Sequence, residues 1–360
     1  MRDNGCASAR GGLARTPFWV WLGCLAVVLS LSACESLVAS GAPRSAEAPL
    51  TPSPTVGVTV AATLEESATV TSMPSPTLTA TVTPPPTATP EPFLCPQLNG
   101  TTERGALQSQ AMGEEVRFIV HLPPCYSDYP QTGFPVLYLL HGWPLTEAHW
   151  MTLGAATVAD DWVSRGIAGP FILVLPGASS DGRYVYSSGG DGSFEGMMVN
   201  ELVPLIDQSY RTVRTPAGRA IGGISRGGVW SLEIALRNQG IFGSVGAHSP
   251  ALALNNPLPQ YDPFLLIRES APQIRIYLDA GDLDWARAST LSLFDKLVEV
   301  GADVRYDVHT GGHVDDLWKG GILDYMAFYT AIWPTSYESL PAWAPMLDTQ
   351  PTDGLPTPTP

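Results

Sequence analysis

The sequence predicts an α/β domain, in which a mostly parallel sheet is covered by helices on both faces. Two observations support this prediction. Short apolar segments, which suit strands buried on both faces, alternate along the chain with segments of helical periodicity. All of them lie between about residues 93 and 333, a length that is sufficient for one sizeable hydrophobic core.

The predicted strands and helices follow one another in regular order. The segment 116–122 has a large apolar residue at every second position, which predicts a strand with one better-buried face. Six later strands are expected at 135–140, 171–175, 219–224, 244–248, 274–278 and 304–308. Helices are expected between them, at 155–165, 197–210, 227–238, 290–300 and 315–332.

Residues 1–33 are predicted to be a lipoprotein signal peptide. Arg2, Arg10 and Arg15 precede an apolar run that is shorter than the roughly twenty residues of a spanning helix. The run ends in Leu-Ser-Ala-Cys, which resembles a bacterial lipobox with Cys34 as the lipid-modified residue. The alternative is an ordinary secretory cleavage site. We therefore expect a protein of the bacterial cell envelope, lipid-anchored on the outer side of the cytoplasmic membrane, or a secreted protein.

Two low-complexity segments flank the predicted domain. Between residues 34 and 92, about half of the residues are Thr, Pro or Ser, so this segment cannot form a core and is expected to be a disordered tether. A similar Pro-rich tail is expected from 334 to 360. The domain itself is placed at 93–333.

Charge and cysteine content restrict the partners and the compartment. With 19 basic and 34 acidic residues, the net charge of −15 provides no positive field for a phosphate backbone, so we exclude nucleic-acid binding. Two of the five cysteines leave with the signal peptide and Cys34 carries lipid. Cys95 and Cys125 remain, and we predict a disulfide between them, with two buried thiols as the alternative.

The most informative motif is Gly223-Ile224-Ser225-Arg226-Gly227, which matches the G-x-S-x-G pattern of a nucleophile elbow. A predicted strand precedes the motif and a predicted helix follows it, as an elbow requires. The glycines avoid collisions with neighbouring backbone, and the start of the helix directs its amides at a developing oxyanion. The motif therefore predicts a nucleophilic serine, Ser225, rather than a simple glycine-rich turn.

Several further segments occur in an order that resembles the putative esterase family of α/β-hydrolases, which includes feruloyl esterases, esterase-D-like enzymes and mycolyltransferases. The resemblance extends roughly from 115 to 329. It rests on the segments 138–143, 174–176, 201–206, 219–228, 242–245 and 311–313. It implies an α/β-hydrolase fold and a serine esterase with the chain order nucleophile, acid, histidine.

This order excludes the three histidines that precede Ser225. Of the remaining three, His313 fits the general base best, because it follows Gly311-Gly312 in a loop beyond a predicted strand and matches the family's Gly-Gly-His motif. His309 lies too close to the end of that strand. We expect His248 to line the pocket.

The orienting acid should follow the predicted strand 274–278, where Asp279, Asp282 and Asp284 compete. Family members carry Gly-x-x-Asp here, which assigns Asp284 as the group that fixes the tautomer of His313. We expect Asp282 to lie in a solvated loop and Asp279 to cap the strand end.

Two main-chain N–H groups are the predicted oxyanion donors. One is the N–H of Arg226, which follows the nucleophile, and the other is that of Trp143, because Pro144 has no amide hydrogen. His141 is expected to anchor this loop structurally.

The predicted function is an extracytoplasmic serine esterase that hydrolyses carboxylic esters through an acyl-enzyme on Ser225. Its expected substrates are small-molecule or carbohydrate esters, with acyl or feruloyl groups on carbohydrate among them. Alternatives are acyl transfer to a sugar, an inactive surface-bound binding protein and, as a minor option, a peptidase. Four tryptophans near the expected pocket could contact substrate or pack in the core: Trp143, Trp150, Trp285 and Trp318. No cofactor is expected, and no metal, because Asp191–Ser193 lacks the spacing of a calcium loop.

Overall fold

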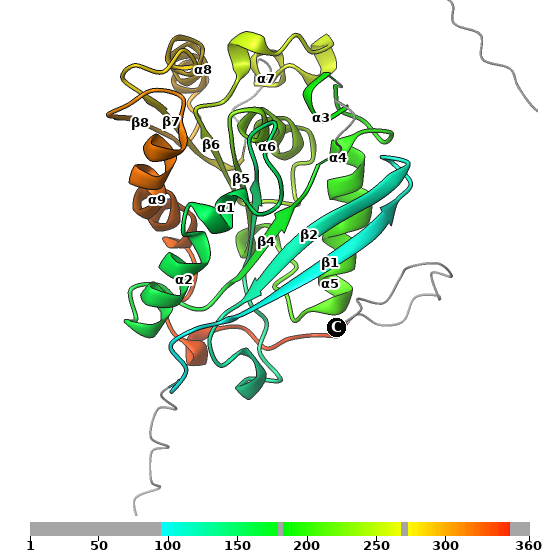
Figure 1. Cartoon of the computed structure of the whole chain (residues 1–360), viewed down its shortest axis with the longest axis vertical. Coiled ribbons are helices and arrows are strands. Elements are labelled where there is room, and N and C mark those ends of the chain that lie inside the picture. Colours follow the sequence, from blue (N-terminus) through cyan, green and yellow to red (C-terminus); the bar gives the residue numbers. More distant parts are fainter. Residues whose placement is uncertain (1–94, 179–182, 187, 268–272, 346–360) are drawn as a thin grey trace, which may run out of the picture. The chain divides into compact units, whose positions relative to one another are not determined.

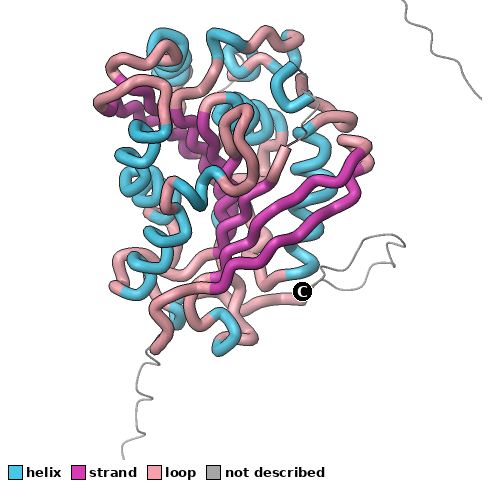
Figure 2. Tube along the Cα trace, viewed as in Figure 1, coloured by secondary structure: helices cyan, strands magenta, loops and turns pink. Residues whose placement is uncertain are grey.

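The structure, a computed structural model, describes residues 95–178, 183–186, 188–267 and 273–345. Eight strands form one sheet in the order β1-β2-β4-β3-β5-β6-β7-β8. β1 and β2 form an antiparallel hairpin at one edge, and β2 also runs antiparallel to β4. All other neighbouring strands are parallel. Figure 1 draws the strands as arrows, and Figure 2 shows the sheet in magenta. This is the α/β-hydrolase architecture that the sequence predicts.

The strands are β1 (Thr101–Ser109), β2 (Glu114–Leu122), β3 (Val136–Leu140), β4 (Ile172–Pro176), β5 (Arg219–Ile224), β6 (Ser244–His248), β7 (Arg275–Gly281) and β8 (Val304–His309). The longer helices are α2 (Ala155–Ser164), α5 (Val203–Ser209), α6 (Arg226–Arg237), α8 (Arg287–Glu299) and α9 (Asp315–Thr330). The short helices are α1 (His149–Thr152), α3 (Arg183–Tyr186), α4 (Phe194–Gly196) and α7 (Pro263–Leu266). A π-helical segment, Met197–Leu202, leads into α5.

The sheet separates two hydrophobic cores, because successive residues of a strand point to opposite faces. In β3, Val136, Tyr138 and Leu140 pack in the core that α5, α6 and α8 cover. Leu137 and Leu139 point into the other core, which α1, α2 and α9 cover. Burial on both faces explains why the central strands lack alternation in the sequence.

One strand was not predicted. The first half of β1 is mostly exposed, and β1 pairs with β2 at the edge of the sheet. Because the sequence of this exposed edge strand is mostly polar, it lacks the apolar pattern from which a strand is predicted. The seven predicted strands and five predicted helices occur within a few residues of their expected bounds, although the helix expected at 197–210 begins as the π-helical segment.

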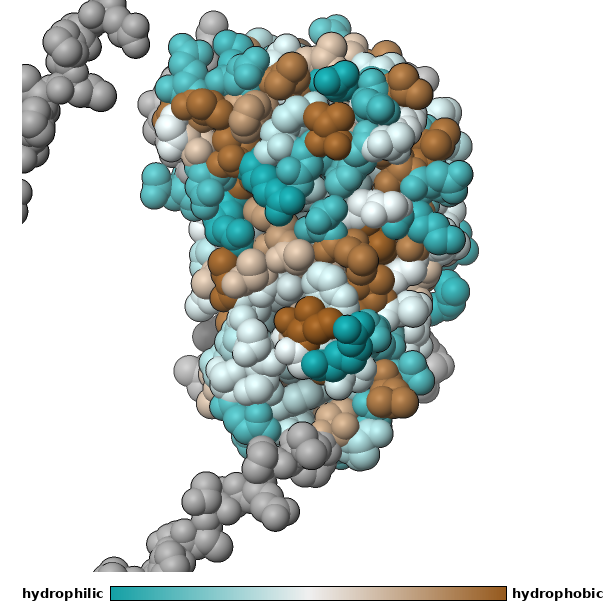
Figure 3. All heavy atoms as spheres, turned by 90° about the vertical axis from the view of Figure 1, so that its left-hand side faces the viewer, coloured by the Kyte–Doolittle hydropathy of each residue, from teal (hydrophilic) through white to brown (hydrophobic). Residues whose placement is uncertain are grey.

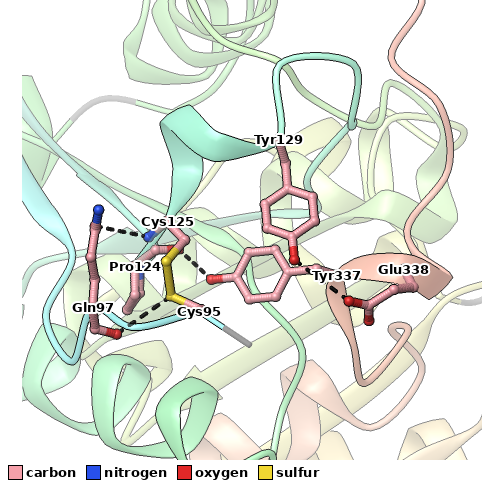
Figure 4. The surroundings of a disulfide bond; sticks show 7 residues. All are labelled: Cys95, Gln97, Pro124, Cys125, Tyr129, Tyr337 and Glu338. Atoms are coloured by element: carbon pink, nitrogen blue, oxygen red, sulfur yellow. Dashed lines mark hydrogen bonds between the residues drawn. A yellow bond between two sulfur atoms is a disulfide. The ribbon is translucent and has the colours of Figure 1, made fainter. Parts of the chain in front are cut away.

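The expected boundary at Trp333 is wrong, because residues after it pack onto the domain (Figure 4). The Tyr337 ring stacks on Tyr129 at 4.4 Å between centroids, and its hydroxyl donates to the carbonyl of Pro124. Thr132 and Ala342 form a β-bridge. The Pro-rich composition of this segment conceals these anchoring contacts, and the ordered domain extends at least to residue 345.

The predicted disulfide between Cys95 and Cys125 is present (Figure 4). Cys125 follows the end of β2, and β2 is antiparallel to β4 and to the strands parallel with it. The disulfide therefore lies at the edge of the sheet where the parallel strands begin. Cys34, the signal peptide, the tether and the last fifteen residues lie outside the described residues.

Within the described ranges, no helix is long and apolar enough to cross a bilayer. On the face shown in Figure 3, apolar residues form separate patches between polar ones rather than one continuous surface.

Candidate active site

Ser225 occupies a strained turn between β5 and α6. Its φ of 55° and ψ of −113° are unfavourable for a residue with a side chain. A Cβ on Gly223 would lie 2.4 Å from the main chain of Gly227, and a Cβ on Gly227 would lie 2.5 Å from the carbonyl oxygen of Leu140. The two glycines of the motif are therefore required by close backbone approach.

A neighbouring turn holds the Ser225 backbone from both sides. The N–H of Ser225 donates to the carbonyl of His248 at 2.9 Å, and the N–H of Ala251 donates to the carbonyl of Ser225 at 3.0 Å. Ser249, between these partners, also has a positive φ of 48°. Strain of this kind persists only where surrounding contacts fix it.

The structure brings the three predicted triad residues together at the carboxyl edge of the sheet. His313 Nε2 lies 2.8 Å from Ser225 Oγ. His313 Nδ1 lies 2.9 Å from Oδ1 and 3.1 Å from Oδ2 of Asp284. Ser225 follows β5, Asp284 follows β7 and His313 follows β8, so parallel strands deliver all three to the same edge.

The environment of Asp284 favours its ionised form. Burial raises the pKa of this carboxyl, but hydrogen bonds from His313 and from the N–H of Ala286 help to lower the pKa below its usual value. The Ala286 N–H lies 2.8 Å from Asp284 Oδ1. An ionised Asp284 accepts the Nδ1 hydrogen of His313, which leaves Nε2 free to accept the hydroxyl hydrogen of Ser225.

The competing residues have structural contacts instead. Asp282 accepts the N–H of Gly311 at 2.8 Å and so fixes the loop that carries His313. The expectation that His248 lines the pocket is wrong: its side chain is fully buried behind the elbow, between Asp279 at 2.9 Å and the Tyr329 hydroxyl at 2.9 Å. Asp279 is likewise fully buried, and its carboxylate accepts hydrogen bonds from His248 and Tyr325 rather than only capping the strand end.

The predicted oxyanion loop lies directly over the nucleophile. A Cβ on Gly142 would lie 3.6 Å from Cβ of Ser225, and Trp143 follows with 53% of its surface exposed. The side chain of Arg226 points away from the nucleophile, since its Nε donates to the carbonyl of Tyr184 at 2.7 Å. This arrangement leaves the N–H groups of Trp143 and Arg226 as the predicted donors.

His141 is neutral in this loop. Burial lowers its pKa to about 4, while a hydrogen bond to the carbonyl of Gly142 opposes this change. Because that carbonyl accepts at 2.9 Å, Nδ1 carries the hydrogen. The Tyr184 hydroxyl donates to the His141 carbonyl at 2.7 Å, so the residue anchors the loop.

The four tryptophans divide into two groups. Trp150 and Trp318 are buried in the core, with 1% and 5% of their surfaces exposed. Trp143 and Trp285 are 53% and 44% exposed beside the site. The sequence alone did not separate these groups, because exposure depends on packing between distant segments.

A cleft of about 330 Å³ borders the oxyanion loop. It lies between residues 141–147 and the neighbouring ends of β2 and β4, and Glu147 and Arg117 are among the polar residues that line it. No group of three or more His, Cys, Asp or Glu side chains within the described ranges could hold a metal ion.

A known protein family matches the region of the chain that carries this site. Residues 109–328 match the family model described as "Putative esterase". The chain belongs to this esterase family. The match contains the complete elbow together with Asp284 and His313, so all three triad residues lie within the family region.

Curated relatives share this region. The chain is 32% identical over 158 residues to an endo-1,4-β-xylanase/feruloyl esterase of Xylanibacter ruminicola, which covers 41% of this chain and 21% of that protein. It is 32% identical over 150 residues to an esterase of Mycobacterium tuberculosis, covering 41% of this chain and 32% of the relative. The matches thus span only about a fifth to a third of these relatives.

Solved structures confirm the fold. A ferulic acid esterase superposes with a TM-score of 0.59 at 23% identity, covering 65% of this chain and 99% of the other. An S-formylglutathione hydrolase of Staphylococcus aureus superposes with a TM-score of 0.56 at 16% identity, covering 64% and 99%.

Proposed function

We propose that the chain is a serine esterase that cleaves carboxylic esters through an acyl-enzyme on Ser225. The observation that carries this proposal is the continuous hydrogen-bonded series Ser225 Oγ, His313 and Asp284. A neutral serine hydroxyl is a poor nucleophile at pH 7, and this arrangement supplies the base that activates it. Membership of the esterase family supports the same conclusion.

Each residue has a defined role in the proposed reaction. Ser225 Oγ attacks the ester carbonyl carbon while His313 Nε2 takes the hydroxyl hydrogen, and Asp284 stabilises the imidazolium. The N–H groups of Trp143 and Arg226 stabilise the oxyanion. His313 then donates its proton to the departing alcohol, and a water molecule activated by the same histidine releases the acid from Ser225.

We propose acyl groups on carbohydrate, feruloyl groups among them, as the substrate class. The names of two similar proteins, a xylanase/feruloyl esterase and a ferulic acid esterase, support this choice. The net charge of −15 disfavours anionic polymers and permits neutral esters. The cleft next to the oxyanion loop provides space beyond the ester group itself.

Hydrolysis of p-nitrophenyl acetate by the full chain tests the proposal, with Ser225→Ala as the comparison. We expect the variant to lose at least about 10³-fold in kcat, because the nucleophile is absent. Labelling by a fluorophosphonate probe should disappear in parallel, while the melting temperature stays within a few degrees. Equal rates for the two proteins would exclude Ser225 as the nucleophile.

We also propose that a lipid on Cys34 holds the enzyme at the outer side of the cytoplasmic membrane. The disulfide between Cys95 and Cys125 supports an oxidising compartment. Metabolic labelling with a radioactive fatty acid, followed by cell fractionation, tests this proposal. The label should enter the wild-type chain and be absent from Cys34→Ser; a wild-type chain without label would exclude the lipid anchor.

A further inference from the structure

Trp285 packs against the histidine of the triad and still exposes 44% of its surface. The two ring centroids lie 4.3 Å apart with an angle of 35° between the ring planes. Trp318 also contacts His313, edge-on at 5.1 Å, but only 5% of its surface is exposed. Of the two tryptophans that contact His313, Trp285 is therefore the one with surface available to a substrate.

The chemistry of ester cleavage determines which part of the substrate lies beside His313. When the tetrahedral intermediate breaks down, the bond from the carbonyl carbon to the alcohol oxygen breaks, and that oxygen takes the proton from His313 Nε2. The alcohol oxygen must therefore lie within hydrogen-bonding distance of Nε2. The atoms bonded to this oxygen then lie close to the Trp285 ring that packs against His313.

Two more large apolar side chains, each next to a triad residue in the chain, are also exposed. Leu283 precedes Asp284 and is 80% exposed, and Val314 follows His313 and is 54% exposed. Large exposed apolar side chains that adjoin catalytic groups gain free energy when a substrate covers them.

We propose that Trp285 is a specificity-determining residue for the alcohol part of the ester. It favours alcohols that carry a ring, because the flat apolar face of the ring packs on the exposed indole. Stacked rings of this kind give a preference of about 2- to 12-fold. This proposal rests on the proposed esterase activity. It specifies in addition that Trp285 contacts the alcohol part of the substrate.

Two pairs of esters distinguish the alcohol side from the acyl side. Benzyl acetate and ethyl acetate share the acyl group, and in the benzyl alcohol part a phenyl ring replaces the methyl group of ethanol. Ethyl phenylacetate and ethyl acetate share the alcohol, and the ring is on the acyl group. For the full chain and for Trp285→Ala, kcat/KM is measured with all three esters.

We expect Trp285→Ala to reduce the preference for benzyl acetate over ethyl acetate by about 2- to 12-fold and to leave the preference within the acyl pair unchanged. Trp285→Phe retains a ring and should keep most of the alcohol preference. Leu323→Ala, at an exposed position of α9, is the matched control and should change neither ratio.

Three results would count against these assignments. An equal loss with all three esters would show that Trp285 only holds His313 in place, and would overturn the specificity role. A change confined to the acyl pair would overturn it by placing the ring on the other side. If the wild-type chain hydrolyses none of the esters, the proposed esterase activity fails, which is distinct from both other results.

Discussion

Replacing Glu233 with Gln will reduce the loss of stability that the protein suffers as pH rises. Glu233 lies on α6 with 1% of its surface exposed, close to a second carboxylate, Glu195. A Cβ on Gly189 would lie 2.0 Å from Glu233 Oε1 and 2.1 Å from Glu195 Oε2, so the two carboxyl groups meet at this glycine.

Burial and the charge of Glu195 raise the pKa of Glu233 to about 8, and neighbouring arginines offset only part of this rise. Glu195 is itself held by Arg237 at 2.8 Å and by Asn238 at 2.7 Å. Glu233 is therefore mostly protonated at neutral pH.

The sign of the pH effect follows from the two pKa values of Glu233. Below its unfolded value of 4.5, the group is protonated in both states, and no stability is lost. Between 4.5 and about 8 it is ionised only in the unfolded chain, so stability falls as pH rises. Each pH unit costs about 1.4 kcal/mol, which gives a loss of about 4 kcal/mol between pH 5 and pH 8.

Gln has the same shape as a protonated Glu and does not titrate. We therefore expect the difference in melting temperature between Glu233→Gln and the wild type to grow by roughly 8–16 °C from pH 5 to pH 8. Thermal unfolding is followed by circular dichroism at one scan rate, with exposed Glu299→Gln on α8 as the control. Parallel curves for Glu233→Gln and the wild type would refute the assignment of a protonated Glu233.

Three other predictions concern the disulfide, the support behind the elbow and the triad acid. Removing the disulfide with Cys95→Ala and Cys125→Ala should lower the free energy of unfolding by about 3–4 kcal/mol, because the bond closes a loop with a sequence separation of 30. The melting temperature should fall while kcat stays unchanged, and an unchanged melting temperature would contradict this. Tyr329→Phe leaves His248 Nε2 without its buried donor and should cost about 1–3 kcal/mol in a denaturant titration, and an unchanged free energy of unfolding would contradict a stabilising role for this hydrogen bond. Asp284→Asn should lower kcat by on the order of 10⁴-fold without loss of fold, whereas near-normal turnover would assign the acid elsewhere.

The triad could be predicted from the sequence because its positions depend on local patterns. Glycines at 223 and 227 are needed wherever a strand turns sharply into a helix, and the short apolar runs identify the strands that end at one edge. His313 and Asp284 follow two such strands. Once the strands are known to be parallel, the three residues are expected at the same edge of the sheet.

The support behind the triad could not be predicted in this way. The His248 side chain contacts Asp279 on the next strand and Tyr329 on α9, and these partners are 31 and 81 residues away. A Cβ on Gly222 or Gly246 would lie within 2.0 Å of the Tyr329 hydroxyl, so both glycines leave room for it. In the sequence, these glycines give no indication of which distant side chain they accommodate.

The exposure of the tryptophans beside the triad could not be predicted from the sequence either. Trp285 and Trp318 both contact His313, yet one is 44% exposed and the other 5%. Their neighbours in the chain do not reveal this difference, because the exposed fraction depends on how α9 packs against α2 and the sheet. Strand order thus brings the reactive residues to one edge of the sheet, whereas the exposure of the tryptophans beside them depends on tertiary packing. Consequently, the paired-ester comparison at Trp285 tests the part of the site that family membership leaves open.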